Sequence, residues 1–248
     1  MSLGCAIITY NEEDSIGRAL ESVSFCDEIV VVDFGSTDRT VEIAKRYTPH
    51  VYYHPWQGYG TQKNIAVDKL STDWVLNIDA DEAITPALAK EITVTLRSPK
   101  FEAYLINIQL VFMGKPLFHG GTYPDYHLRL FKKGSFRFKE NLVHEGVSFE
   151  KSKVGRLKNP ALHYSYRDLT HYIEKLNKYT SLIAQKHAQN GKKPGKLFPF
   201  ARMGFELIKR FGLRGAFLDG YEGSVYALLS SFYAFLKYAK LEELNRKK

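Results

Sequence analysis

The chain has 248 residues, of which 44% are hydrophobic and 25% are charged, and its formal net charge is +8. This composition is typical of a globular protein with one large domain, or one domain with an appendage. The two cysteines, Cys5 and Cys26, exclude a disulfide framework and favour a reducing cytoplasm. Met1 to Tyr10 has no basic start and runs directly into a strand pattern, so no secretory signal is predicted.

The first hundred residues alternate predicted strands and helices. Continuous apolar runs without polar alternation predict strands that are buried on both faces, and amphipathic segments between them predict covering helices. Asn11 is a candidate N-cap for the first helix, and Thr85-Pro86 is a typical start for the fourth. The predicted strands are 5–9, 29–32, 51–53 and 74–78. Two of the predicted helices span 39–47 and 62–70, and the other two begin after residue 11 and after residue 85. This order predicts an α/β fold with a mostly parallel sheet.

Polar residues follow three of these strands. In parallel sheets, ligands bind beyond the carboxyl ends of the strands. Each polar stretch alone is well explained as a helix cap, but three at one edge of a sheet favour a binding site. The stretches are Thr9-Tyr10-Asn11-Glu12, Asp33 to Asp38 and Asp79-Ala80-Asp81.

The third stretch crowds three carboxylates, Asp79, Asp81 and Glu82, into four positions. Like charges at this spacing repel, and partial burial increases the cost. Alternate residues at a strand end can place two carboxylates around one hard cation, and Mg²⁺ and Mn²⁺ take oxygen ligands that they share with phosphates. The sequence therefore predicts a divalent cation with a diphosphate at this edge.

Other nucleotide and metal motifs are absent. Gly58-x-Gly60 begins like a dinucleotide fingerprint, but Lys63 stands where the third glycine belongs, and no P-loop pattern occurs. His144-Glu145 is not followed by the second histidine of a zincin. A zinc site is not predicted either, because the histidines at 119, 127, 144 and 163 are too scattered and are better explained as structural.

After residue 101 the pattern changes. Segments 103–111 and 126–131 predict strands of a mixed sheet extension, and helices are predicted at 169–189, 198–209 and 223–244. The segment 191–195, GKKPG, is a linker. Lysine and arginine are concentrated in the last hundred residues. This excess predicts an anionic partner, such as nucleic acid, a phosphorylated substrate or an acidic membrane surface, with a merely solvated surface as the alternative.

Four blocks in the first 85 or so residues together resemble family 2 glycosyltransferases of the GT-A fold, which are inverting enzymes that use a nucleotide-sugar. They read AIITYNEEDSIGRALESV, EIVVVDFGSTDRTVEIA, GYGTQKNIAV and DWVLNIDADE. Three later stretches resemble, less specifically, the lipopolysaccharide-core branch, which includes β-glucosyltransferases that act on the heptose region. They read YHLRLFKKGSFRF, NLVHEGV and DGYEGSVYALLSSFYAFLKYAKL.

The resemblance implies roles for particular residues. The nucleoside pocket would be lined by Thr9, Tyr10, Asn11 and Glu12. Phe34 departs from the pattern, because many relatives have an acidic or small polar residue there.

Further along, Asp33 would read the uracil edge, and Lys63 and Asn64 would approach the base and ribose. Within Asp79-Ala80-Asp81, Asp79 would lie near the ribose and Asp81 would bind Mn²⁺ or Mg²⁺, with Asp79 as a second candidate ligand.

An inverting transfer needs a base opposite the leaving group. The resemblance assigns this role to Glu145, beside His144, and the alternative is a surface glutamate paired with Arg137 or Lys139. Arg129 and His144 are candidates for contact with the phosphates or the acceptor, and for Arg129 a structural salt bridge is equally compatible with the sequence.

The predicted catalytic domain covers residues 1–167, with a nucleotide-binding half at 1–100 and an acceptor half at 101–167. The helical extension covers 168–248. Between 198 and 217, phenylalanines interleave with arginine and lysine at helical spacing. This pattern suits an interfacial membrane helix, and packing against the catalytic domain is the alternative.

The sequence thus predicts a metal-dependent transferase that moves a hexose, glucose first, from a UDP-sugar to an inner-core heptose of lipopolysaccharide. The expected location is the cytoplasm, with peripheral contact to the anionic inner membrane as an option. A family 2 enzyme with another cell-envelope acceptor is the first alternative. A basic nucleic-acid-binding protein is the second, although an acidic rim would repel phosphates.

Overall fold

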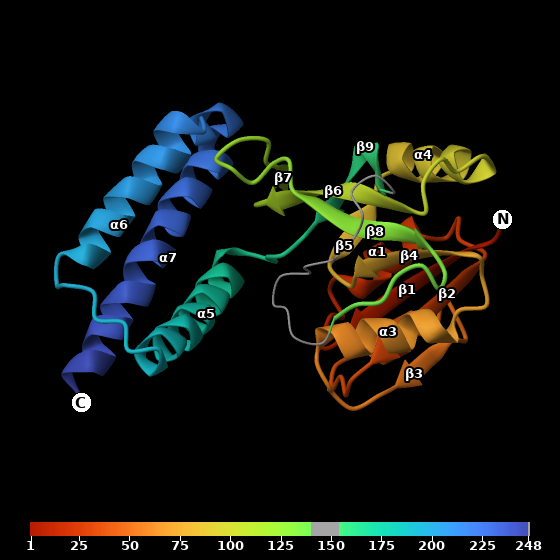
Figure 1. The fold of residues 1–248 in the computed structure, drawn as a ribbon, viewed down its shortest axis with the longest axis horizontal. Coiled ribbons are helices and arrows are strands. Elements are labelled where there is room, and N and C mark those ends of the chain that lie inside the picture. The colour runs from red at the N-terminus through yellow and green to blue at the C-terminus, as the bar shows by residue number, and fades with distance from the viewer. Residues whose placement is uncertain (140–153, 248) are drawn as a thin grey trace. The chain divides into compact units, whose positions relative to one another are not determined.

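The computed structural model describes residues 1–139 and 154–247, and the chain divides into two units. Unit 1 comprises Met1–Gln109 and Asp125–Tyr164, and unit 2 comprises Leu110–Pro124 and Ser165–Lys248. Figure 1 labels the elements. Up to the fourth helix, they are β1 (Leu3–Thr9), α1 (Ile16–Ser22), β2 (Glu28–Asp33), α2 (Thr40–Ala44), β3 (Val51–Tyr53), α3 (Tyr59–Lys69), β4 (Trp74–Asp79), β5 (Glu82–Ile84) and α4 (Pro86–Arg97). The remaining strands are β6 (Ala103–Phe112), β7 (Lys115–Pro116), β8 (Tyr126–Lys132) and β9 (Val154–His163).

The described strands form one mixed sheet in the order β3-β2-β1-β4-β8-β6-β9-β5, with β7 paired to β6. Strands β3, β2, β1 and β4 are parallel, and β8 runs antiparallel between β4 and β6. The predicted α/β fold, with a parallel core of strands, flanking helices and C-terminal helices, is confirmed. The short strands β5 and β7 and the long strand β9 were not predicted.

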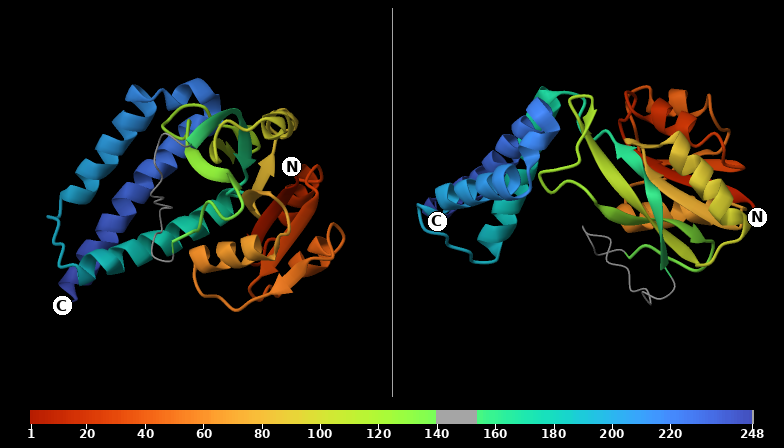
Figure 2. Two further views of the ribbon diagram at one scale, coloured as in Figure 1. Left: turned by 45° about the vertical axis from the view of Figure 1, so that its right-hand side comes forward. Right: turned by 90° about the horizontal axis from the view of Figure 1, so that it is seen from above.

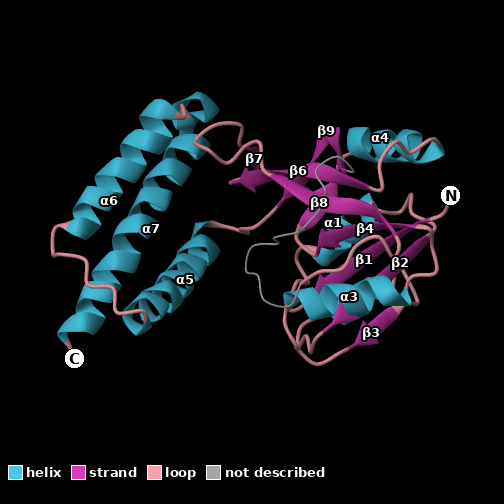
Figure 3. Ribbon diagram, in the orientation of Figure 1, coloured by secondary structure: helices cyan, strands magenta, loops and turns pink. Residues whose placement is uncertain are grey.

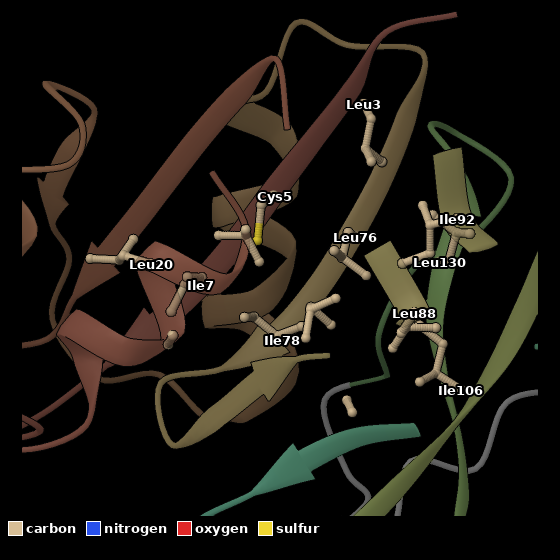
Figure 4. Packing of buried hydrophobic residues seen from close by; sticks show 14 of the residues in the cluster. Leu3, Cys5, Ile7, Leu20, Leu76, Ile78, Leu88, Ile92, Ile106 and Leu130 are labelled. Atoms are coloured by element: carbon tan, nitrogen blue, oxygen red, sulfur yellow. The ribbon is translucent and has the colours of Figure 1, made fainter. Parts of the chain in front are cut away.

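The sheet of unit 1 is covered on both faces, which explains the continuous apolar runs in its sequence. On β1, Cys5 and Ile7 belong to the core that includes residues of α1 and α4, as Figure 4 shows. Ala6 and Ile8 point the other way and pack with Ala66 of α3. A strand with apolar neighbours on both faces has no polar alternation.

Two predicted helix starts have different outcomes. Thr85 caps α4, because its hydroxyl accepts a hydrogen bond from the Leu88 N–H, and Pro86 occupies the first turn, as predicted. The predicted cap at Asn11 is wrong. Asn11 has a positive φ of 53°, and its side chain accepts from the Thr37 N–H, while α1 begins five residues later at Ile16.

Unit 2 is almost entirely helical (Figure 3). It contains α5 (Leu169–Gln189), α6 (Phe198–Leu207), the π-helical η2 (Ile208–Leu213), the 3₁₀ turn η3 (Ala216–Asp219) and α7 (Gly220–Arg246). The helix α7 packs against both α5 and α6 (Figure 2). At Gly223, an added Cβ would lie 2.2 Å from the Ala216 carbonyl oxygen, so the close approach of η3 to α7 requires glycine.

Residues 110–124 belong to unit 2, whereas the predicted division at residue 167 placed them in the acceptor half. The physical reason is a separate apolar cluster, in which Phe112 and Leu117 pack with Tyr172 and Leu176 of α5. Of the described helices, none has the length and apolar character needed to cross a membrane.

Candidate functional site

The carboxyl ends of β1, β2 and β4 meet at one edge of the sheet. Thr9 is in register with Asp33 on β2, and Ile8 is in register with Asp79 on β4. The three polar stretches that follow these strands therefore lie together, as the strand pattern predicts. We refer to this edge as the polar rim.

At the end of β1, aromatic rings from several segments stack in series. The Tyr10 ring lies nearly parallel to Phe34, with ring centres 4.8 Å apart, and Phe34 contacts Trp56 at 4.6 Å. Trp56 in turn meets Tyr59 edge-on. Phe34, the departure from the family pattern, is therefore the centre of a stack that orients Tyr10. Beside it, the hydroxyl of Thr9 is buried without a hydrogen-bond partner among the described residues.

The loops after β1 and β2 are held together by side-chain hydrogen bonds to the backbone. The Asp33 carboxylate accepts from the N–H groups of Gly35 and Ser36, at 2.9 and 3.0 Å. The Glu12 N–H donates to the hydroxyl of Thr40, 2.8 Å away. Asp33 is buried, and its carboxylate fixes the loop that follows β2.

The crowded carboxylates of the rim are balanced by protein cations. Asp79 accepts from both Lys63 and Arg129: one carboxylate oxygen lies 3.0 Å from the Lys63 ammonium, and the other lies 2.7 Å from the guanidinium. Arg129 also pairs with Glu82, whose side chain is buried. Of the two roles considered for Arg129, the structure shows the salt bridge. Lys63, which was expected near the base and ribose, forms an ion pair with Asp79.

The pKa values of these groups follow from burial and charge. Burial opposes ionisation of Asp79, but Arg129 and Lys63 outweigh it and hold the pKa of that carboxyl well below its ordinary range. For Glu82, burial and the neighbouring Asp79 charge raise the pKa, and Arg129 only partly offsets them. Arg129 is therefore what allows the buried Glu82 and the half-buried Asp79 to lie side by side.

The second aspartate of the motif has a different partner. Asp81 lies 3.1 Å from Nε2 of His163, at the end of β9, and Ala80 between the two aspartates is buried. Burial would lower the pKa of His163, but the hydrogen bond and charge of Asp81 raise it to about 9. Neither His163 nor Glu82 was predicted as a rim residue. The acidic run pointed towards Glu82, but nothing in the sequence marks His163, which comes from a strand 82 positions away.

Asn64 is engaged by the backbone of Phe138. Its side-chain amide donates to the Phe138 carbonyl at 2.8 Å and accepts from the Phe138 N–H at 2.9 Å. We expect Asn64→Ala to lower the stability of unit 1 by about 1–3 kcal/mol. The substitution removes the hydrogen-bond partners of the backbone N–H and carbonyl of Phe138, which is buried. Both tryptophans, Trp56 and Trp74, lie in unit 1, so tryptophan fluorescence in urea reports its unfolding.

The matched control is Asp68→Ala, which removes an exposed side chain from the same helix. If Asn64→Ala kept the stability of the control and lost only affinity for UDP, the role in binding base and ribose would be favoured instead.

Glu145 and His144 lie outside the described residues, so the assignment of the base stays a prediction. Within residues 1–139 and 154–247, no group of three His, Cys, Asp or Glu side chains is arranged to hold a metal ion by itself. Magnesium does not require such a cage, because it commonly uses one or two carboxylates together with substrate phosphates. Asp81 fits that pattern. Asp79 fits it less well, since both of its oxygens already bind cations.

Comparison with known proteins adds three findings. The model of the family described as Glycosyl transferase family 2 matches residues 5–149. The lipopolysaccharide core biosynthesis glycosyltransferase LpsC of Rhizobium meliloti is 30% identical over 248 residues, covering 97% of this chain and 92% of that protein. A Rickettsia typhi protein named as an uncharacterized glycosyltransferase is 35% identical, covering 97% of this chain and 87% of its own.

Among solved structures, S. aureus TarS 1–349 in complex with UDP-GlcNAc aligns with a TM-score of 0.50 and 17% identity. The alignment covers 100% of this chain and 92% of TarS 1–349. At this identity, the likeness concerns the fold.

Proposed function

The chain belongs to glycosyltransferase family 2. We propose that it transfers a hexose, with glucose as the first candidate, from a UDP-sugar to a heptose of the lipopolysaccharide inner core. The name of LpsC, a relative along nearly its whole length, supports the acceptor class. The four sequence blocks of the first 85 or so residues support the donor class. The family match argues against the alternative of a nucleic-acid-binding protein.

The polar rim is the observation that carries this proposal. It combines an aromatic ring at Tyr10, a buried hydroxyl at Thr9 and an ordered loop at Asp33 on one side. On the other side stands Asp81, in the turn between β4 and β5, where its carboxylate lies 3.1 Å from Nε2 of His163. The first group suits a nucleoside, and the second suits the cation that accompanies a diphosphate.

Each rim residue then has a defined task. Asp79 fixes Lys63 and Arg129, so that the floor of the rim is nearly neutral overall and does not repel a diphosphate. Asp81 would bind Mn²⁺ or Mg²⁺, which when present neutralises charge that develops on the departing diphosphate. Thr9, Tyr10, Asn11, Glu12 and Asp33 would surround the nucleoside.

The attacking hydroxyl of the acceptor must lose its proton as the new bond forms at the anomeric carbon. Glu145 is our proposed base, on the resemblance of the NLVHEGV stretch. An undiminished kcat in a Glu145→Gln variant would exclude it.

The experiment that tests the proposal is a donor and acceptor screen of the full chain. UDP-glucose, UDP-galactose, UDP-N-acetylglucosamine and their GDP counterparts are compared with Mn²⁺, with Mg²⁺ and with chelator. Acceptors are heptose-containing core oligosaccharides and a core that lacks heptose. We expect metal-dependent turnover of a UDP-hexose on heptose-containing core. Transfer only to other envelope glycans would favour the first alternative, and turnover of GDP-sugars alone would overturn the donor assignment.

A further inference from the structure

The helix α6 and the π-helical turn η2 that continues it leave several large apolar side chains exposed, although Phe198 and Phe200 also contact α7. Phe200, Phe205 and Ile208 are 62%, 53% and 67% exposed. Leu197 precedes the helix and Leu213 ends η2, and each is 80% exposed. A helix on a water-facing surface normally buries most of its large apolar side chains.

The charged residues of the same helix lie on the more protected side. Glu206 is paired with Arg202 at 2.8 Å and with Arg210 at 3.5 Å, and all three side chains are less exposed than the apolar ones. Charged groups thus pair with one another, while Phe205 and Ile208 are exposed and Phe200 is only partly covered by Phe235 of α7. Phe211 of η2, also exposed, contacts the ring of Phe217 on η3, with ring centres 5.6 Å apart. Exposed apolar surface of this kind marks an interaction site in a natural protein.

The apolar surface continues onto the next turn. Phe217 and Leu218 of η3 are 49% and 62% exposed, and Tyr221 at the start of α7 is also exposed. We call the whole region, from Leu197 to Tyr221, the α6–η3 surface (Figure 1).

The α6–η3 surface is strongly basic at its edges. Between residues 191 and 221 there are seven lysines and arginines but only two acidic residues. Lys192, Lys193 and Lys196 immediately precede α6 and are exposed, as is Arg214 after η2. Asp219, one of the two acidic residues, is buried. The exposed charge around the apolar residues is therefore almost entirely positive.

The surface is also held firmly in place. Asp219 accepts hydrogen bonds from the N–H groups of Phe118 and His119, at 2.9 and 2.7 Å, and from the His119 ring at 2.8 Å. The Gly120 N–H donates to the Arg214 carbonyl at 2.9 Å. Because these bonds fix η3 to the loop after β7, the backbone that carries Phe217 and Leu218 is already ordered before any partner binds.

From this combination, we propose that the α6–η3 surface docks on an anionic lipid bilayer, with its apolar side chains in the headgroup region. Apolar rings flanked by lysine and arginine are the chemistry that binds such an interface. A second copy of this chain would bring the same positive charges against each other, which opposes pairing of two such faces. The inference does not depend on the donor or the acceptor of the transferase.

Vesicle flotation of the full chain, without any nucleotide-sugar, tests the apolar part. Wild type is expected to float with vesicles of phosphatidylcholine mixed with phosphatidylglycerol, and not with phosphatidylcholine alone. Ile208→Ser should weaken this binding about tenfold, since it removes a large apolar side chain from the interface. The matched control is Val94→Ser, an exposed aliphatic residue of α4 in unit 1.

The basic part is tested with two triple variants of equal charge change. Removing three charges beside α6 should weaken binding to anionic vesicles by about 10²-fold at low salt, because each lysine near the surface contributes separately. The test triple is Lys192→Gln, Lys193→Gln and Lys196→Gln, and the control triple is Lys45→Gln, Lys90→Gln and Lys100→Gln.

Three results would overturn the proposal. They are absence of wild-type binding to anionic vesicles, equal loss in test and control variants, and dimerisation through Ile208 in sedimentation without vesicle binding. Because the assay contains no donor or acceptor, a failed sugar transfer would leave its outcome untouched.

Discussion

Replacing Asp81 with asparagine is expected to lower metal-dependent sugar transfer by about 10³-fold or more, because a cation that stabilises the leaving diphosphate contributes several kcal/mol. Asparagine has the same size as aspartate, and its amide oxygen can still accept the hydrogen bond from His163. It removes the negative charge that a divalent cation requires. The measurements are kcat/KM with Mn²⁺ and with Mg²⁺, and calorimetric UDP binding with and without Mn²⁺.

The control for this prediction is Asp68→Asn, which removes a carboxylate of unit 1 that pairs only at the surface with Arg137. It should leave transfer and Mn²⁺-dependent UDP binding unchanged. An Asp81→Asn protein that is folded and still shows full metal-dependent transfer would place the cation elsewhere, and the rim would then need another explanation.

Replacing Arg129 with methionine is expected to destabilise unit 1 by about 3–5 kcal/mol, the usual cost of removing one partner of a buried ion pair. Arg129 is buried and contacts both Asp79 and Glu82. Without it, Asp79 retains Lys63, whereas the buried Glu82 loses its salt-bridge partner. Urea unfolding followed by tryptophan fluorescence measures the loss, since both tryptophans belong to unit 1.

Two comparisons separate this effect from a general loss of positive charge. Arg137→Met breaks an exposed pair with Asp68 and should cost about 1 kcal/mol at most. Adding Glu82→Gln to Arg129→Met should restore part of the stability, because the buried group is then neutral and its amide oxygen can still accept from the Asp79 N–H. Equal stability of Arg129→Met and Arg137→Met would show that the rim carboxyls do not need the guanidinium.

Much of the architecture could be read from local patterns. The continuous apolar runs predicted β1, β2 and β4, because a strand that is covered on both faces must be apolar on both. The position of Asp33 and Asp79 at strand ends predicted the polar rim, since the carboxyl ends of parallel strands meet at one edge.

Other features could not be read in this way. The strand β9 carries polar residues within it, so its pattern did not stand out, and the loop between β7 and β8 joined unit 2 through contacts with α5 that no local signal marks.

The amino-acid sequence by itself therefore determined the α/β fold, the acidic motif at Asp79 and Asp81, and the amphipathic character of α6. Only the tertiary structure decided which cations neutralise that motif and which side of α6 faces outward. Lys63, Arg129 and His163 reach the rim from α3, β8 and β9, and charge pairing over such separations follows no periodicity along the chain. A helical repeat likewise fixes which residues share a face, but the packing of neighbouring helices determines whether that face is covered.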